Sequence, residues 1–538
     1  MAEERAGDWV DAIDLLRLRE AGPTALKLRD RQIALFVHEG SVLACNNRCP
    51  HEGYPLCEGT LDDGGVLTCQ WHNWKFDLRT GANRYGGDAL RVYPVRIEHG
   101  RVWVDVSDPP PEQRVAQALG RIGEAVDEHD PPRIARELAR LEQAGAPPEV
   151  ALLQAVLRSH ARLRYGMTHA YAAADAWLRL RELQTAPAQR LACATEALAY
   201  IGFDTLREAD YPYTTVRRPW AEAEFMAAVE AQDEDAAVGC VNDALDRGVP
   251  LDGLLPILAA AALAHYNDFG HSLIYLVHVR NLVARLGPVA AGPLLRAWVR
   301  ALVFATREDL LPDFKGYRDA LAQWPLAPPL QPSALPPPAA MFEALSVRRT
   351  LAAVVDAAAL HAPSALWPAL MQTAAQHLLR FDERHALRTD NPVSADVGWL
   401  DFSHALTFGH ALRQAASLRP DLWPAGLLQM ALFVGRNTPY LVDGLDSTAA
   451  VAAWQVDDPA AFAADSQLRI IDHGIGVPIF AAHRLKTWLA VHDTVAQGIA
   501  PQATAALCAA VRRLLAVQFK QRHALRVARQ ALHFVERE

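Results

Sequence analysis

The sequence has 538 residues, of which 51% are hydrophobic and 21% charged, and its formal net charge is −9. This length exceeds what one hydrophobic core usually fills, so we expect several domains. The negative charge argues against a nucleic-acid partner. No basic-then-apolar leader and no run of about 18 uncharged apolar residues is visible, so we expect a cytoplasmic protein that does not span a membrane.

Residues 1–107 have the pattern of a small all-β domain. Gln32–Val37 is a short apolar run, and every second residue of Val102–Val106 is a valine. Glycines separate these segments at short intervals. This rhythm is typical of a small antiparallel barrel or sandwich.

The composition changes after the proline spacer Asp108–Pro111, where the chain becomes rich in Ala, Leu and Arg. Apolar residues then recur three and four positions apart, as in amphipathic helices. A second proline-rich break lies at 325–340, and helical patterning resumes after it. We therefore predict a multidomain fold, with a small all-β domain followed by a large all-α region. Its predicted parts are a β domain at 1–107 and two helical halves at 113–324 and 341–538.

Two short motifs in the β domain bring cysteine and histidine together. Cys49-Pro50-His51 is followed, after seventeen residues, by Cys69-Gln70-Trp71-His72. Each motif offers one thiolate and one imidazole, which together match the two Cys and two His ligands of a [2Fe–2S] cluster of mixed ligation. A zinc site is the alternative, because zinc also binds Cys and His.

The residues around these motifs continue through Phe76, Thr80-Gly81 and Gly100–Val104. The run from 8 to 107 resembles the Rieske ferredoxins and the Rieske domains of ring-hydroxylating oxygenases. The resemblance implies a [2Fe–2S] cluster held by Cys49, His51, Cys69 and His72. Tyr54 follows three residues after His51, and Cys57 has no matching partner, so we expect no disulfide of the cytochrome bc type.

The helical region contains a repeated pattern around histidine. Asn267–Leu273 and Leu400–Leu406 both read Asp-Phe-small-His-small-Leu, and Met167–Tyr171 is a weaker copy without the Asp. Asp and His three residues apart share one helix face. Pairs of this kind on facing helices build carboxylate-bridged metal sites.

Two interpretations of this pattern stay open. One is a second, non-haem iron site formed by Asp268, His271, Asp401 and His404, with His169 as a further ligand. The other is an old helical duplication whose histidines make hydrogen bonds in the core.

No phosphate-binding glycine loop and no dinucleotide fingerprint occurs in the helical region. We therefore expect an external reductase or ferredoxin as electron donor. Short pieces of the region, His404–Arg413 and His483-x2-Lys486, resemble the questin oxidase-like proteins, helical oxygenases acting on aromatic polyketides. This resemblance implies that an oxygenase domain can be all-helical, and no catalytic residue is carried over from it.

Our first functional hypothesis is an oxidoreductase that passes single electrons from the external donor, through the cluster, to a site in the helical region. There an oxygenase reaction on a small organic substrate is expected, with no catalytic residue assigned. A non-catalytic redox sensor or electron carrier with a helical docking scaffold is the alternative. A third possibility is a cofactor-free helical oxygenase regulated by the Rieske domain.

Overall fold

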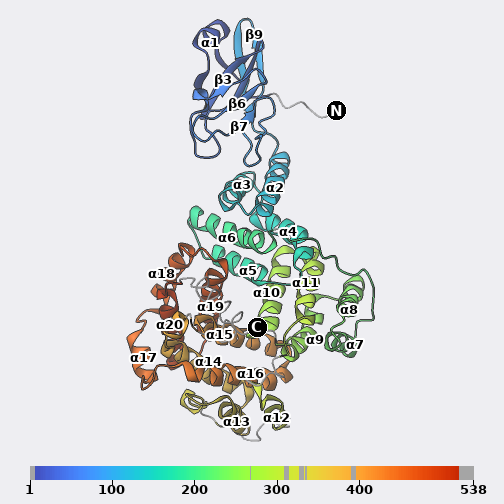
Figure 1. Cartoon of the computed structure of the whole chain (residues 1–538), viewed down its shortest axis with the longest axis vertical. Coiled ribbons are helices and arrows are strands. Elements are labelled where there is room, and N and C mark those ends of the chain that lie inside the picture. The colour runs from blue at the N-terminus through green and yellow to red at the C-terminus, as the bar shows by residue number, and fades with distance from the viewer. Residues whose placement is uncertain are drawn as a thin grey trace, which may run out of the picture. The chain divides into compact units, whose positions relative to one another are not determined.

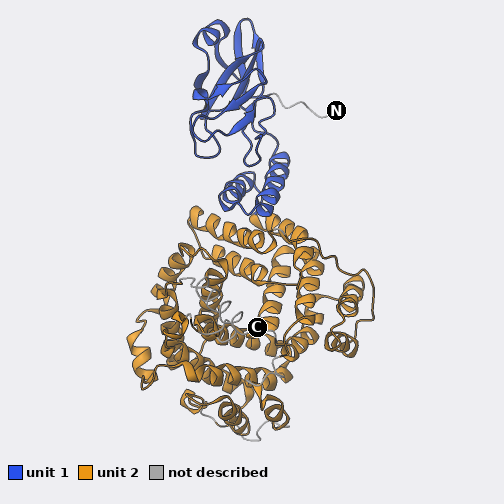
Figure 2. Ribbon diagram, in the orientation of Figure 1, with its two compact units in different colours: residues 1–147 blue, residues 148–538 orange. Residues whose placement is uncertain are grey.

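The computed structural model describes residues 7–206, 208–266, 268–307, 314–325, 333, 336–388, 390 and 396–519. The chain divides into two compact units, residues 1–147 (unit 1) and residues 148–538 (unit 2), shown in Figure 2. Every strand of the described residues belongs to unit 1, and unit 2 is helical (Figure 1). The predicted fold class, a small β domain followed by a large helical region, is confirmed.

The strands of unit 1 form three antiparallel sheets, with orders β1-β10-β9, β2-β3-β4-β8 and β5-β6-β7. The elements of this part are β1 (Trp9–Asp14), α1 (Leu15–Ala21), β2 (Thr24–Leu28), β3 (Arg31–His38), β4 (Ser41–Asn46), η1 (Leu56–Glu58), β5 (Thr60–Leu61), β6 (Val66–Thr68), β7 (Lys75–Asp77), β8 (Val92–Tyr93), β9 (Val95–Glu98) and β10 (Arg101–Asp105).

Strand β3 lies between two hydrophobic cores. Ile33 enters one core, and the next residue, Ala34, enters the other. Both faces of the strand are therefore buried, which explains why its sequence is a continuous apolar run without alternation. The second core also contains Cys49 and Cys69, so β3 supports the loops that carry these cysteines.

Two helices complete unit 1, α2 (Pro111–Asp127) and α3 (Pro131–Gln143). Both begin at a proline, which suits the first helical position because the missing N–H has no partner there. Unit 1 thus extends to residue 147, beyond the predicted β domain. The division into 1–107, 113–324 and 341–538 stays a prediction.

Unit 2 is built from helices. Its elements are α4 (Pro148–Ser159), η2 (His160–Arg162), α5 (His169–Glu182), α6 (Pro187–Thr205), α7 (Glu222–Glu230), α8 (Glu234–Asp246), α9 (Leu251–Ala264), α10 (His271–Leu286), η3 (Pro288–Ala290), α11 (Ala291–Val303), α12 (Tyr317–Ala322), η6 (Ala339–Met341), α13 (Val347–Ala358), α14 (Pro363–Arg380), η7 (His385–Leu387), α15 (Trp399–Leu418), η9 (Pro420–Leu422), α16 (Trp423–Asn437), η10 (Thr438–Tyr440), α17 (Ser447–Ala453), α18 (Pro459–Ile471), α19 (Pro478–Ala496) and α20 (Pro501–Ala516).

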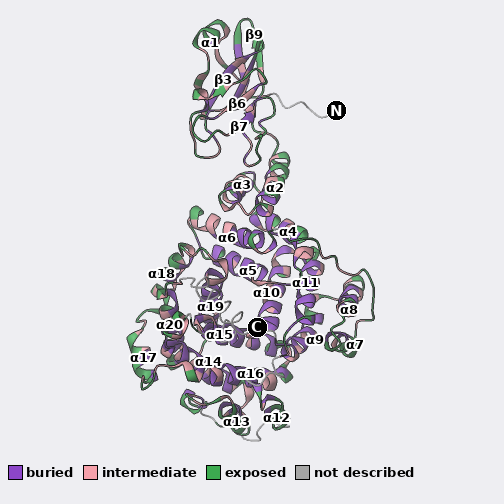
Figure 3. Cartoon of the chain, in the orientation of Figure 1, coloured by how far each residue is buried: buried purple, intermediate pink, exposed green. Residues whose placement is uncertain are grey.

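Four of these helices form an inner ring: α5 packs against α10 and α19, and α15 packs against the same two helices. Other helices cover the ring from outside, with α6 on α5, α11 on α10, α14 and α16 on α15, and α20 on α19 (Figure 1). The inner helices are buried along most of their length (Figure 3). A helix covered on all sides needs apolar or small residues all round, as at 170–174 of α5. Polar side chains on these helices are consequently enclosed.

No helix within the described ranges is long and apolar enough to cross a membrane.

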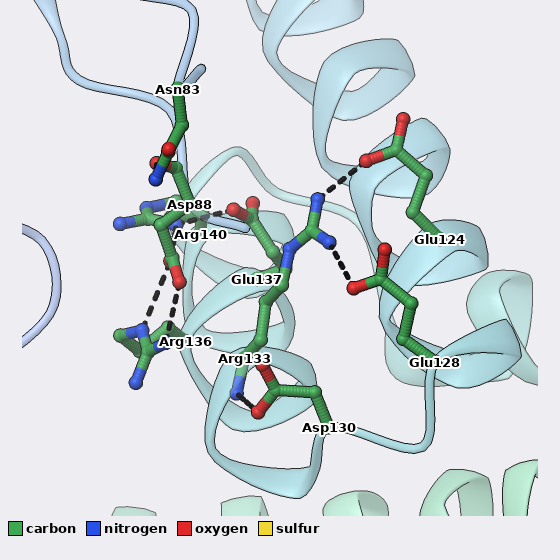
Figure 4. A network of polar contacts seen from close by, with 9 residues as sticks. All are labelled: Asn83, Asp88, Glu124, Glu128, Asp130, Arg133, Arg136, Glu137 and Arg140. Atoms are coloured by element: carbon green, nitrogen blue, oxygen red, sulfur yellow. Dashed lines mark hydrogen bonds and ion pairs between the residues drawn. The ribbon is translucent and has the colours of Figure 1, made fainter. Parts of the chain in front are cut away.

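A buried ion-pair network joins the loop before β8 to α3 within unit 1 (Figure 4). The carboxylate of Asp88 has no exposed surface and accepts hydrogen bonds from Arg136 Nε at 3.0 Å and Arg140 Nη1 at 3.1 Å. Burial favours the neutral carboxyl, but the two guanidinium groups outweigh it and hold the pKa of Asp88 below its ordinary value. The loop is therefore fixed to α3 by charge.

A second part of the network fixes α3 to α2. The guanidinium of Arg133, only 1% exposed, bonds to Glu124 at 2.5 Å and to Glu128 at 3.0 Å. Asp130 begins α3 by accepting a hydrogen bond from the backbone N–H of Arg133 at 3.0 Å. Loop, α3 and α2 therefore form one connected assembly.

Replacing Asp88 with Asn should loosen this assembly. The change leaves Arg136 and Arg140 without their carboxylate, and we expect a loss of about 2 kcal/mol because both guanidinium groups are partly exposed. Hydrogen exchange followed by mass spectrometry should show faster amide exchange in 131–143. Asp8→Asn, which breaks an exposed pair with Arg29, is the matched control and should leave that exchange unchanged.

The difference in hydrogen exchange between the parent and the Asp88→Asn protein should depend on pH. Because the pKa of Asp88 is lowered in the folded chain, the ion pair contributes fully above the unfolded carboxyl pKa of about 3.9 and less as pH falls below it. The difference in exchange between the parent and the Asp88→Asn protein should shrink as pH is lowered from about 7 towards about 3. An undiminished difference at the lower pH would show that the network does not act through charge.

Candidate metal centres

The two Cys-His motifs form two copies of one loop. In the first, the N–H of Cys49 donates to the Tyr54 carbonyl at 2.9 Å, and the N–H of Gly53 donates to the Cys49 carbonyl at 2.8 Å. In the second, Cys69 N–H donates to the Trp74 carbonyl at 2.8 Å and Asn73 N–H to the Cys69 carbonyl at 3.1 Å.

In both loops the residue four after the cysteine is left-handed. Gly53 has φ +80° and Asn73 has φ +60°. Glycine adopts this conformation freely and asparagine tolerates it better than most residues, so each loop closes tightly beneath its ligands.

The four predicted cluster ligands converge. His51 Nδ1 and His72 Nδ1 lie 3.2 Å apart, and the Cys49 and Cys69 thiols are buried together in the second core. Burial, with the neighbouring Cys69 as a further cause, raises the pKa of Cys49 to about 11. A buried thiol with a raised pKa, such as Cys49, stays protonated by itself, whereas bound iron stabilises the thiolate. The donor set and its geometry therefore fit a [2Fe–2S] cluster with Cys2His2 ligation.

Aromatic rings flank the two imidazoles. The Trp74 ring stacks on His51 with centroids 4.6 Å apart, and the Trp71 ring stacks on His72 at 5.1 Å. Trp71 is 56% exposed. A carboxylate oxygen of Glu52 lies 3.9 Å from His72 Nε2, whereas the other ring nitrogen, Nδ1, faces His51. All seven cysteines of the chain are free of disulfides.

This fold and its two ligand loops define an iron–sulfur electron-transfer domain. A family model described as the Rieske [2Fe-2S] domain matches residues 8–94. The ferredoxin component of the alkene monooxygenase system of Xanthobacter autotrophicus is 30% identical over 112 residues, which cover 21% of this chain and 92% of that protein. The chain belongs to the Rieske [2Fe-2S] family through this domain, and it is an electron-transfer Rieske protein.

Other relatives and structures match the same part. The ferredoxin component of the naphthalene 1,2-dioxygenase system of Pseudomonas aeruginosa is 31% identical over 101 residues, covering 18% of this chain and 96% of that protein. The structure of the ferredoxin of carbazole 1,9a-dioxygenase from Nocardioides aromaticivorans IC177 covers 18% of this chain and 98% of its own, with 25% identity and a TM-score of 0.18.

In unit 2 the inner ring brings four histidines together. His169 begins α5, His271 begins α10, His404 lies in α15 and His483 in α19. Their ligand atoms all lie within 4.8 Å of one another. His271 Nε2 is 3.0 Å from His169 Nε2 and 3.0 Å from His404 Nε2, and His483 Nε2 is 3.1 Å from His404 Nε2. We call these residues the four-histidine group.

Backbone carbonyls determine which nitrogen carries the proton on two of these rings. His404 Nδ1 is 2.6 Å from the Leu400 carbonyl, and His483 Nδ1 is 2.6 Å from the Ile479 carbonyl. A carbonyl only accepts, so both Nδ1 atoms carry hydrogen. In the neutral imidazoles the two Nε2 atoms then have none, and their 3.1 Å contact brings two lone pairs face to face.

Burial keeps these imidazoles neutral. Loss of hydration, together with the nearby Lys486 ammonium, lowers the pKa of His404 to about 3 and the pKa of His483 well below its ordinary value. His169, which is half-buried, shifts in the same direction for the same two causes. Burial also lowers the pKa of Lys486 to about 7. His169, His404 and His483 are therefore neutral nitrogen donors, and Lys486 is a titratable amine near them.

A strained turn leads into His271. Asp268, Phe269 and Gly270 are all left-handed, with φ of +40°, +55° and +80°. A Cβ on residue 270 would lie 2.3 Å from the Phe408 ring, so glycine is required there. The turn stacks the Phe269 ring on His404 with centroids 4.8 Å apart. Strain of this kind concentrates at functional sites.

The structure brings three of the five predicted second-site residues together, His169, His271 and His404. Asp401 instead accepts a hydrogen bond from the Gly398 N–H at 2.8 Å and caps α15. Asp268 lies in the strained turn. Among the described residues, neither carboxylate belongs to the group of converging ligand atoms.

His483 occupies the fourth position, which the repeated pattern does not reveal because Arg484, and not a small residue, follows it. The sequence singled out His483 only in the piece that resembles the questin oxidase-like proteins, without a ligand role. The signal that could have found it is the pair of alanines before it, since small neighbours leave room around an imidazole, as they do at His169 and His404.

The second cluster loop should depend on the backbone conformation of residue 73. Asn73→Gly keeps the left-handed turn accessible and should retain the cluster. Asn73→Val should cost about 1–2 kcal/mol locally, because a β-branched residue resists positive φ, and should lower cluster content. Visible absorption and iron analysis of the two purified variants measure this. Equal cluster loading of both would show that the loop conformation does not limit assembly.

Proposed function

We propose that this protein is a Rieske oxidoreductase in which single electrons from an external reductase or ferredoxin reach a metal ion, non-haem iron, held by His169, His271, His404 and His483. The reaction at that ion is an oxygenation of a small organic substrate by dioxygen. The observation that carries the proposal is the contact between the unprotonated Nε2 atoms of His404 and His483. Such a contact is repulsive in a buried site unless a cation lies between the nitrogens.

The surroundings of the four-histidine group support a metal site. Ligating histidines characteristically donate their second N–H to a carbonyl or carboxylate, which orients the ring and strengthens the donor nitrogen. His404 and His483 do this through Leu400 and Ile479. The Tyr275 hydroxyl, 3.0 Å from Nδ1 of His169, gives a third ring a hydrogen-bond partner on its outer side. Imidazole is a donor that iron, zinc, copper and nickel all accept. Iron and copper are the members of this set that activate dioxygen with single electrons, and the proposal takes iron.

The Rieske unit supports the oxygenase part of the proposal. Cys49, His51, Cys69 and His72 hold a cluster that supplies one-electron transfer when bound. The relatives described above are ferredoxin components of a monooxygenase and a dioxygenase system. In this chain the electron acceptor is proposed to be the helical unit that follows in the same polypeptide.

The chain's own residues would prepare the helical site in three ways. The inner ring buries His271, His404 and His483. The Phe269 ring covers one face of His404. Lys486, with its lowered pKa, holds or releases a proton near the group at neutral pH. Cysteines free of disulfides suit a cytoplasmic location, which is part of the proposal.

Metal analysis of the purified chain tests the proposal. About two iron atoms per chain account for the cluster alone, and about three are expected with the second site. His404→Ala and His483→Ala should each lower iron by about one atom per chain. The Rieske EPR signal of the reduced protein should stay unchanged, because the cluster ligands are in the other unit.

Asp401→Asn is the informative control, since Asn also accepts a hydrogen bond from Gly398 and the helix cap survives. Iron content should not change if the imidazoles are the ligands, whereas loss of iron would make Asp401 a ligand. A chain that binds about two iron atoms, and whose iron content no histidine variant alters, would contradict the second site. It would favour an electron carrier with a helical scaffold.

A further inference from the structure

A large cleft in unit 1 lies beside one of the cluster ligands. Its volume is about 1220 Å3. The Cys49–Gly53 loop, including His51, forms one wall, and residues of α2 and α3 form the other. Small-molecule pockets usually measure about 300–1,000 Å3, so this cleft is large enough for a segment of another protein.

Arginines are prominent in the lining of this cleft, which we call the arginine cleft: Arg48, Arg91, Arg114, Arg121, Arg136 and Arg140. Three of them already have carboxylate partners, because Asp108 pairs with Arg91, and Asp88 pairs with Arg136 and Arg140.

The other three, Arg48, Arg114 and Arg121, form no ion pair within 4.0 Å of any residue that the structure describes, although the charge of Arg121 acts on the buried Glu137 carboxyl. Arg114 Nε is in addition buried without a hydrogen-bond partner. The lining also contains four carboxylates, of which Asp108 and Glu137 are bound to arginines and Glu52 and Asp105 are not. A positive surplus therefore lies beside His51 in a chain whose net charge is −9.

The network in Figure 4 holds the wall of this cleft in place. Asp88 ties α3 to the loop before β8, and Arg133 ties α2 to α3. Arg114 and Arg121 on α2 are thereby held at a set distance from the cluster loop. Because these side chains are already held in place, little free energy is needed to order them when a charged partner binds.

We propose that the arginine cleft receives an acidic segment of the protein that reduces the Rieske cluster. The proposal rests on the proposed function, which requires an external electron donor, and it adds the chemistry and the position of the contact. Carboxylates of the donor pair with Arg48, Arg114 and Arg121, and the donor approaches the cluster on the His51 side. One electron passes from the reduced donor, which is oxidised by one electron, to the oxidised cluster, and no bond is made or broken.

Stopped-flow reduction of the cluster in the full-length holoprotein tests this. The probe is a reduced plant-type [2Fe–2S] ferredoxin, an acidic protein whose potential lies below that of Rieske centres. At low ionic strength, Arg114→Glu together with Arg121→Glu should lower the second-order rate constant roughly tenfold or more, because attraction becomes repulsion. At about 0.5 M salt the parent and the variant should converge, since screening removes steering.

Matched variants keep this test specific. Arg17→Glu with Arg19→Glu makes the same charge change on α1, outside the cleft, and should alter the rate less than about twofold. Arg114→Lys with Arg121→Lys keeps the charge and should keep the rate. Should the Glu variant fail to load its cluster, Arg114→Gln with Arg121→Gln takes its place, with a smaller expected loss in the same direction.

Two results would overturn the proposal. One is an equal rate loss, or none, in the α1 and α2 variants. The other is saturable inhibition by inorganic pyrophosphate at constant ionic strength that the α2 variant abolishes, which would assign the cleft to a small anion. Neither result bears on the four-histidine group, because its iron content is measured separately and without an electron donor.

Discussion

The close approach of His404 Nε2 and His483 Nε2, 3.1 Å apart, is the constraint on which the interior of the helical unit depends. The Leu400 and Ile479 carbonyls take the Nδ1 protons, so neither ring has a proton left to place between the two nitrogens. In a buried environment two facing lone pairs repel each other, and the proposed metal ion would remove that repulsion. The helices α5, α10, α15 and α19 of the inner ring each contribute one histidine to this group, and the strained turn leads into His271.

In unit 1 the buried polar group is charged, and side chains of opposite charge pair with it. There the enclosed group is the Asp88 carboxylate, and two arginines on α3 neutralise it. The result is a rigid hairpin beside the cluster loop, with further arginines that lack such partners. A Rieske domain needs only its two ligand loops for the cluster, so a helical hairpin held this firmly changes which surfaces can approach His51. Trp71, which is exposed and stacks on His72, is not among the residues that line the arginine cleft.

Much of the fold was predictable because its signals are local. The change from glycine-punctuated strands to Ala- and Leu-rich helices follows from backbone preferences that act within a few residues. The helices α2 and α3 show the limit of this approach, since composition groups them with the helical region, whereas their packing and ion pairs place them in unit 1. Pairing with Asp88 is a contact across 48 residues, which no local pattern records.

By itself the sequence determined the Rieske site, because each Cys-His pair lies in one short loop and hydrogen bonds within a few residues shape that loop. It also singled out His169, His271 and His404 through a repeated local pattern. Only the tertiary structure grouped His483 with these three histidines and left Asp268 and Asp401 outside the group. Asp401 shares a helix face with His404, yet its carboxylate turns back to the N–H of Gly398. Spacing on one helix shows which residues share a face, whereas the packing of four helices from distant parts of the chain determines which atoms meet.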